Sequence, residues 1–417
     1  MKMLFENSLA FARQLDQADP LRSYRDRFYI PERNGKPLIY FCGNSLGLQP
    51  KTARQALDCE LAIWQQHGVE GWFEGENPWL TIHQRCKEPL AQIVGANPSE
   101  VCPMNNLTVN LHLLLTSFYQ PTGNRTKILT IGGDFPSDQY ALETHIQTRG
   151  LNPADTLVEV FPRTHEHTWQ TADILDAVEQ YRDSLALVLM SGLHYYTGQV
   201  FDMAAIAQKA RQIGVPIGFD LAHAVGNIPL KLHDWGVDFA FWCSYKYLNS
   251  GPGGVSGIFV HENHHAAALP RLAGWWGYDE ARRFEMTKGF VPMPGADGWQ
   301  LSTPTVLAMA VHHAALQLTA EAGLDALRRK SELLTGFLEF VLRETAGLQI
   351  ITPINAAERG CQLSLLIDHD GKTVFNRLTE QGVIGDWREP DCIRLAPTPL
   401  YNTFEEVWRV GQAFASC

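Results

Sequence analysis

A lysine between two tyrosines, Lys246, is the first residue of this chain whose setting suggests chemistry. It lies in 243-CSYKYLNSGPGG-254, directly after an apolar run and before a glycine-rich turn. Asp220 ends the apolar run 215-VPIGFD-220, and His223 follows three residues later. Other polar residues follow predicted strands or stand at a predicted helix start: Ser191, Asp138 and Thr108. Because ligands of parallel α/β sheets bind beyond the carboxyl ends of the strands, we expect these side chains to share one site.

These residue types suit the cofactor pyridoxal 5'-phosphate. The cofactor needs a lysine that bonds to its aldehyde and a carboxylate that keeps its pyridine nitrogen protonated, so that the ring can accept electrons. Lys246 and Asp220 suit these two roles. The cofactor phosphate needs backbone N–H groups at a helix N-terminus, and the turn at Leu107 and Thr108 is the candidate. Phe135 is the candidate ring that covers the pyridine face.

Each of these residues alone has a simpler structural explanation. An aspartate at a strand end is more often a turn or cap residue, and a lysine after an apolar run more often extends along a sheet edge to water. The cofactor hypothesis therefore rests on the combination and on its order along the chain. The histidines of 261-HENHH-265 match no known zinc spacing, so we expect no metal there. The glycines of 251-GPGGVSG-257 fall short of a dinucleotide fingerprint.

The elements that position these residues form an α/β pattern. Between about residues 100 and 260, continuous apolar strands alternate with helices, which indicates a mostly parallel sheet buried on both faces. From residue 305 the pattern changes to a long helix over 305–344, followed by short strands and helices. We predict three parts: an N-terminal segment, 1–45, that packs with the small domain; a large cofactor-binding domain, 46–304; and a small C-terminal α+β domain, 305–417.

Composition excludes several classes of function. The 417 residues carry a net charge of −11 without a basic stripe, so we expect no nucleic-acid partner. No apolar run approaches the roughly 18 residues of a membrane span, and the N-terminus lacks the unbroken apolar core of a signal peptide. The eight cysteines are scattered without a CxxC pair, which favours a reducing cytoplasm.

Longer motifs give the chain a family resemblance. The segment 219-FDLAHAVGNIPLKLHDWGVDFAFWCSYKYLNSGPGG-254 closely resembles kynureninase, a pyridoxal-phosphate enzyme of the aspartate aminotransferase fold, fold type I. Further segments resemble the same family in the same order: 41-FCGNSLGLQPK-51, 105-NNLTVNLHLLLTSFY-119, 135-FPSDQYA-141, 191-SGLHYYTGQ-199 and 394-RLAPTPLYNTF-404. The resemblance implies a large domain with a seven-stranded sheet and a homodimer. It also implies tryptophan degradation, with hydrolysis of L-kynurenine, and of 3-hydroxykynurenine, to anthranilate, or 3-hydroxyanthranilate, and L-alanine.

The resemblance also implies roles for individual residues. Lys246 matches the lysine that carries the cofactor and takes the substrate Cα proton, and Asp220 and His223 match residues at the cofactor ring. Arg394 matches the arginine that binds the substrate α-carboxylate, a role suited to a bidentate guanidinium. Further cofactor contacts match these positions: Leu107, Thr108, Phe135, Pro136, Ser137, Asp138, Ser191 and Tyr245. Two positions match residues that reach the cofactor from a second subunit: Trp275 and Thr303.

Some assignments leave alternatives open. Some family members carry Asn where this chain has Thr303, which alters a hydrogen bond to substrate or phosphate. Ser45 is expected near the substrate, and His67 is a candidate in a loop where the match slips. Tyr245 either donates a proton during the reaction or only hydrogen-bonds the phosphate. Aromatic candidates for a pocket around the substrate ring are Trp72, Trp275, Trp276 and Tyr195.

Two other classes of protein compete with this interpretation. The first is a different fold type I enzyme, such as a class V aminotransferase or a cysteine desulfurase. A desulfurase needs a mobile cysteine in a loop of the C-terminal half, whereas Cys361 and Cys392 lie in predicted apolar strands. The second is a non-catalytic binding protein, which would have no need to keep Lys246, Asp220 and Arg394 together.

Overall fold

A seven-stranded sheet is the centre of the computed structural model, which describes residues 4–417. The strand order is β4-β10-β9-β8-β7-β5-β6. The bounds are β4 (Val101–Pro103), β5 (Lys127–Ile131), β6 (Leu157–Val160), β7 (Leu185–Ser191), β8 (Ile217–Asp220), β9 (Phe239–Trp242) and β10 (Gly257–Val260). Strand β10 is antiparallel to both of its neighbours, and the other pairs are parallel. The predicted fold, a mostly parallel sheet of seven strands, is confirmed.

Helices cover both faces of this sheet. In strand β9, alternate residues contribute apolar side chains to opposite faces of the sheet, because successive side chains of a strand point in opposite directions. Phe239 and Phe241 pack with residues of α4 (Leu107–Phe118) and α5 (Pro136–Thr148). Trp242 packs into the opposite core, whose helices are α3 (Lys87–Val94), α7 (Thr171–Gln180) and α8 (Met203–Gln212). Burial on both faces explains why the strands read as unbroken apolar runs.

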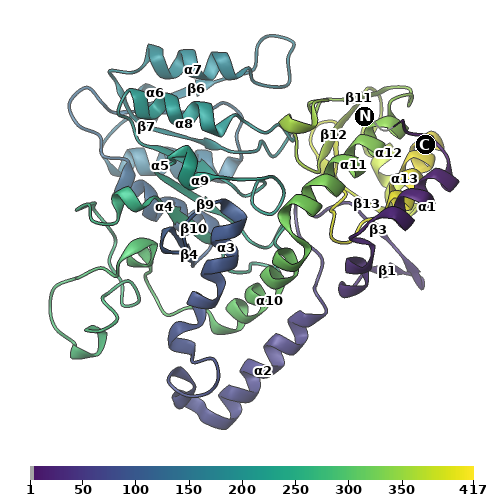
Figure 1. Cartoon of the computed structure of the whole chain (residues 1–417). Coiled ribbons are helices and arrows are strands. Elements are labelled where there is room, and N and C mark those ends of the chain that lie inside the picture. The colour runs from purple at the N-terminus through teal and green to yellow at the C-terminus, as the bar shows by residue number, and fades with distance from the viewer. Residues whose placement is uncertain (1–3) are drawn as a thin grey trace.

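A second, smaller α+β unit follows in the C-terminal part of the chain. Its antiparallel sheet has the order β11-β12-β15-β14. The bounds are β11 (Leu348–Ile350), β12 (Leu363–Ile367), β14 (Asp386–Arg388), β15 (Cys392–Leu395), α12 (Gly371–Glu380) and α13 (Phe404–Ala415). The N-terminal helix α1 (Leu9–Ala18) lies against α13, and Figure 1 shows both chain ends in this unit. Strand β3 (Ile39–Tyr40) also pairs here, with β13 (Val383–Ile384).

The predicted continuous helix over 305–344 is wrong. It is two helices, α10 (Val306–Ala322) and α11 (Leu324–Leu342), which meet at Gly323 with a φ of +76°. A positive φ is incompatible with an α-helix and is readily adopted by glycine. The break lets α10 pack against α2 (Thr52–His67) and the large-sheet core, while α11 packs into the C-terminal core. Among residues 4–417, no helix is both long and apolar enough to cross a membrane.

Candidate active site

A cavity of about 300 Å³ lies at the carboxyl ends of β5, β7, β8 and β9, where the large sheet meets the smaller unit. It brings together these predicted residues: Ser45, Leu107, Thr108, Phe135, Ser137, Ser191, Asp220, His223, Tyr245, Lys246 and Arg394. Tyr195, one of the aromatic candidates, lines it too. Residues that the sequence analysis did not single out complete the lining: Asn44, Asp134, Leu193, Ala222 and Arg388. The expectation that strand ends converge on one site is therefore met.

Lys246 and His223 form the basic centre of the cavity. The Lys246 Nζ atom lies 3.0 Å from His223 Nε2. Burial, followed by the charge of Lys246, lowers the pKa of His223 well below its usual value, so the imidazole is neutral and can accept a hydrogen bond from the Lys246 amino group. Burial raises the pKa of the neighbouring Tyr245 above its usual value, so this phenol keeps its proton at neutral pH.

Three buried carboxyl groups lie close together at the site: Asp134 and Asp220 line the cavity, and Asp138 lies next to Asp220 outside the lining. Burial, followed by repulsion from Asp220, raises the pKa of Asp134 to about 7, and the same two causes raise the pKa of Asp138 well above its usual value. Burial also raises the pKa of Asp220, although Lys246 and the Ala222 N–H at 2.7 Å favour its ionised form. Like charges in a low dielectric do not all ionise together, so the cluster holds a proton near neutral pH.

Two helix N-termini also line the cavity. Helix α4 begins at Leu107 and α5 begins at Pro136, and neither has a side-chain cap on its first N–H groups. The hydroxyl groups of Thr108 and Ser137 lie 2.9 Å apart and join the two ends. Free N–H groups at helix N-termini, with their partial positive charge, form a binding site for phosphate.

The smaller unit contributes two arginines, Arg394 and Arg388, to the cavity lining. Arg394, fully buried on β15, donates to the Tyr195 carbonyl at 2.7 Å and to Asp386 Oδ2 at 2.5 Å. Arg388 Nε lies 3.0 Å from Asp386 Oδ1, and the Ser45 hydroxyl donates to Asp386 as well. The two arginines and one aspartate leave a net positive charge here, which suits an anionic end of a substrate.

The remaining predicted residues lie outside this cavity. Pro136 is the first residue of α5, and Asp138 is buried beneath the lining. His67 ends α2 and lies 3.5 Å from Glu74. Trp275 and Thr303 are exposed. The aromatic candidates Trp72 and Trp276 pack on each other, with ring centroids 5.7 Å apart.

Three of the missed residues are charged, and they were missed for two reasons. Asp134 follows β5 by three residues and accepts N–H groups of Phe135 and Ser191, at 2.8 and 3.2 Å. The strand-end argument that selected Asp220 would also have found it. Asp386 and Arg388 lie on the short strand β14, whose pairing with β15 places Asp386 opposite Arg394. No local pattern in the sequence announces that pairing.

The residues present fit pyridoxal phosphate. Buried polar atoms on the cavity walls have no hydrogen-bond partner within residues 4–417: Ser191 Oγ, His223 Nδ1 and Arg394 Nε. A buried polar atom without a partner is costly in a folded protein, and such atoms are expected where a ligand supplies the partner. With the uncapped helix ends for a phosphate, Asp220 for a cationic ring nitrogen and Lys246 for an aldehyde, the donor set matches the cofactor that the sequence predicts.

Solved structures share this fold at low sequence identity. The cystine C–S lyase C-DES, in complex with its reaction product cysteine persulfide, is 20% identical with a TM-score of 0.77, over 91% of this chain and 97% of its own. The cysteine desulfurase CsdA of Escherichia coli is 16% identical with a TM-score of 0.75, over 99% and 98%. At these identities the likeness concerns the fold alone.

Curated sequences are much more similar. A kynureninase of Flavobacterium psychrophilum is 50% identical, and one of Xanthomonas oryzae pv. oryzae is 53% identical, each over 98% of both chains. The family described as Kynureninase C-terminal domain matches residues 327–414, which include Asp386, Arg388 and Arg394. The alignments therefore cover nearly all of both the large and the small unit. The chain belongs to the kynureninase family.

Proposed function

We propose that this protein hydrolyses L-kynurenine to anthranilate and L-alanine, with pyridoxal 5'-phosphate as its cofactor. The observation that carries the proposal is the full-length similarity of about 50% to kynureninases, combined with one cavity that holds Lys246, Asp220, His223 and Arg394. When bound, pyridoxal phosphate supplies an electron sink that allows a carbon–carbon bond of an amino acid to break. The protein is therefore a hydrolase of carbon–carbon bonds that depends on this cofactor.

Lys246 is the proton-transfer group of the site. Its Nζ atom, held 3.0 Å from the neutral His223, takes the proton from the substrate Cα and later returns it. Asp220, fixed by the Ala222 N–H at 2.7 Å, supports the positive charge on the ring nitrogen of the cofactor. The pKa of Tyr245 is raised by burial, so its protonated phenol suits proton donation to the substrate as well as a hydrogen bond to phosphate. Both roles of Tyr245 remain in the proposal.

Arg394 orients the substrate by its α-carboxylate. Its Nε atom has no partner among the described residues, while its two other nitrogens are held by Tyr195 and Asp386. A guanidinium that is fixed at one edge binds a carboxylate at the other with little loss of side-chain entropy. Ser45 lies beside this pair, and the ring of Tyr195 packs edge-on against Phe135 with a centroid distance of 5.3 Å. These two rings are candidates to contact the aromatic end of the substrate and the cofactor ring.

The desulfurase alternative is disfavoured by the C-terminal cysteines. Cys361 and Cys392 are both fully buried, and burial raises the pKa of Cys361 to about 12 and that of Cys392 to about 11. Neither can serve as a mobile thiolate nucleophile, which must be exposed and of low pKa. This chain thus shares its fold with low-identity relatives that perform sulfur chemistry, but Cys361 and Cys392 do not provide it with an exposed thiolate.

A homodimer and a cytoplasmic location complete the proposal. Trp275 and Thr303, predicted to reach a cofactor in the partner subunit, are exposed and do not line the cavity of their own chain. Exposed apolar side chains also gather in the segments 61–73 and 275–291, as expected of a subunit interface: Leu61, Trp64, Val69, Phe73, Trp275, Phe284, Met286, Phe290 and Val291. Light scattering of the purified protein, with a mass of about twice 46.7 kDa expected, tests the dimer.

The direct test of function follows anthranilate fluorescence after L-kynurenine is added to the purified protein with pyridoxal phosphate. We expect anthranilate and L-alanine in equal amounts, with 3-hydroxykynurenine assayed in parallel. Consumption of L-kynurenine without anthranilate, or sulfur release from L-cysteine instead, would move the protein to another fold type I activity.

A further inference from the structure

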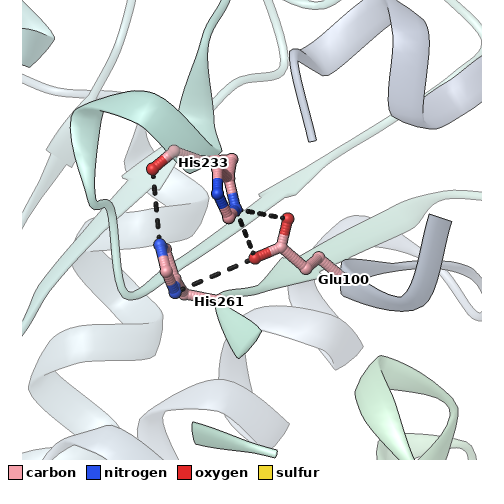
Figure 2. Close-up of side chains that lie close together, drawn as sticks. All are labelled: Glu100, His233 and His261. Carbon is pink, nitrogen blue, oxygen red and sulfur yellow. Dashed lines mark hydrogen bonds and ion pairs between the residues drawn. The ribbon is translucent and has the colours of Figure 1, made fainter. Parts of the chain in front are cut away.

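Three side chains outside the active site converge on one point: Glu100, His233 and His261 (Figure 2). Glu100 ends the short helix η4 (Pro98–Glu100), His233 lies in α9 (Leu232–Trp235), and His261 directly follows β10. Their candidate ligand atoms all lie within 4.8 Å of one another. The sequence analysis expected no metal at 261–265 because the local spacing matches no zinc motif. The fold supplies the two other side chains from distant parts of the chain.

The distances between the donor atoms suit a small cation. His233 Nδ1 lies 3.0 Å from Glu100 Oε1 and 3.1 Å from Oε2. His261 Nδ1 lies 3.8 Å from Glu100 Oε1. Ligands at about 2.1 Å from a tetrahedral metal lie about 3.4 Å from one another, so the distances of 3.0 and 3.8 Å from Glu100 Oε1 each differ from this spacing by about 0.4 Å. The two imidazole rings are stacked, with an interplanar angle of 10° and centroids 5.0 Å apart, and so present the same edge to the carboxylate.

Hydrogen bonds already orient two of the ligands. His261 Nε2 lies 3.3 Å from the His233 carbonyl and can only donate to it, which leaves a lone pair on His261 Nδ1 facing the cluster. The Asn263 N–H donates a hydrogen bond to this lone pair at 3.2 Å, and a bound metal ion would replace that hydrogen bond. Glu100 is held by the N–H groups of Asn97 at 2.8 Å and Glu262 at 2.9 Å, one on each oxygen. A backbone carbonyl that fixes the tautomer of a histidine is the usual support of a metal-binding imidazole.

The local charge and exposure also favour a cation. Glu100 is fully buried, and two more carboxylates, Asp234 and Glu262, lie near His233. The His233 side chain is 33% exposed, so a metal can reach the cluster from solvent and keep water ligands. Two imidazoles with one carboxylate form a donor set typical of zinc and similar transition metals. Without metal, the proton on His233 Nδ1 holds the cluster together.

We propose that Glu100, His233 and His261 bind one divalent transition-metal ion, zinc being the best match, with water at the remaining position. The ion would join η4, α9 and the end of β10, three segments far apart in the sequence. Glu100 directly precedes β4, the strand that leads into the turn at Leu107 and Thr108. We therefore assign the ion a stabilising role in the large unit. The proposal does not depend on the reaction proposed above.

The test is to titrate the cofactor-loaded protein with Zn²⁺ and with Co²⁺. Calorimetry measures the binding of Zn²⁺, and the visible absorption bands of the bound ion measure the binding of Co²⁺. We expect one ion per chain and a rise of the thermal midpoint with Zn²⁺. His233→Asn should weaken binding at least about tenfold, because one of three protein ligands is lost. His264→Asn is the matched control, since His264 lies on the neighbouring short helix and bonds to Asp238 instead.

Glu100→Gln gives a second, independent arm. This change keeps the shape of the buried side chain and removes its charge, and thermal unfolding shows whether the variant is folded. We expect it to abolish the rise in midpoint with Zn²⁺ and the Co²⁺ bands. Absence of binding to the wild-type protein, or binding that His233→Asn and Glu100→Gln both leave unchanged, would overturn the site.

Discussion

Two regions of this molecule bury ionisable side chains. In one region the opposite charges are paired, and in the other several carboxyl groups repel one another. Where the N-terminal helix meets α11, Lys330 and Asp19 are both buried and pair at 2.7 Å, and Asp19 also accepts the Leu21 N–H at 2.9 Å. At the active site, three buried carboxyl groups lie close together, and repulsion from Asp220 adds to burial in raising the pKa of Asp134 and of Asp138.

The difference separates a structural role from a chemical one. A buried pair with matched charges resists solvent and holds two elements in register. A cluster with surplus carboxyl groups and unpartnered atoms, such as Ser191 Oγ and His223 Nδ1, reaches its lowest free energy only with a ligand. The comparison predicts that changes in the first region alter stability alone, and that changes in the second alter catalysis or the dependence of stability on pH.

The largest expected effect is that of Lys246→Ala on catalysis. The variant removes the amino group that lies 3.0 Å from His223 and whose charge acts on Asp220, so we expect the rate of anthranilate formation to fall by about 10³-fold or more. The urea midpoint of the apoprotein should stay close to that of the wild type. A variant that retains a tenth of the wild-type rate would remove Lys246 from the mechanism.

Lys330→Met should have the next largest effect, this time on stability. The change leaves Asp19 buried without its partner, which costs about 3–5 kcal/mol of unfolding free energy. Urea unfolding measures this loss, and kcat per folded molecule should be unchanged. Lys209→Met is the control, because the Lys209–Glu179 pair is partly exposed and solvent screens its attraction, so its loss should destabilise the protein much less. Equal losses of unfolding free energy for Lys330→Met and Lys209→Met would contradict a special structural role of the buried Lys330–Asp19 pair.

The pH dependence of stability should reveal the surplus carboxyl group. The pKa of Asp134 is raised by burial to about 7 in the folded protein, from 3.8, so the folded state binds the proton more tightly than the unfolded state. Stability from this group is therefore greatest below pH 4 and falls as the pH rises towards 7. The upper limit of the fall is about 4 kcal/mol, since one pKa unit equals about 1.4 kcal/mol.

The measurement compares the urea unfolding of apoprotein with that of Asp134→Asn from pH 4 to pH 8. The stability of the wild type relative to the variant should decline across this range and level off above pH 7. Effects of the substitution that do not titrate, such as an altered hydrogen bond to the Ser191 N–H, shift the whole curve without changing its slope. A flat difference would show that Asp134 ionises normally.

Arg388→Gln should have the smallest effect, on substrate binding. Arg388 offsets the charge of Asp386, which otherwise faces the substrate carboxylate beside Arg394. We expect KM for L-kynurenine to rise about tenfold, equivalent to about 1.4 kcal/mol, with kcat changed much less. Arg388→Lys should restore part of the affinity, and Arg163→Gln, a surface pair with Asp173, should change neither constant. A fall in kcat at constant KM would assign Arg388 another role.

The sequence predicted the large sheet well because burial on both faces leaves a strong signal. Runs such as 185–191 are apolar throughout, and all seven residues of β7 are buried. The same reasoning predicted that Asp220 and Lys246 lie together, and both line one cavity in the structure, since the carboxyl ends of parallel strands meet at one edge. The signal failed at Gly323, because a single glycine inside an apolar helical pattern does not reveal its φ.

Other parts of the site depend on contacts that no local pattern encodes. Asp386 reaches Arg394 through the pairing of two short strands, and Glu100 reaches His233 and His261 through the order of strands in the sheet. Such pairings follow from tertiary packing, which a single sequence without its structure does not display. His67 and Trp275 remain predictions, because neither lines the cavity of a single chain.

The most direct measurement is the identification of the lysine that carries the cofactor. The protein loaded with pyridoxal phosphate is reduced with borohydride, digested, and its labelled peptide is sequenced by mass spectrometry. We predict one phosphopyridoxyl group per chain, on Lys246, in the peptide that includes 243-CSYKY-247. A label on another lysine, or no label after loading, would contradict the assignment of this cavity as the active site.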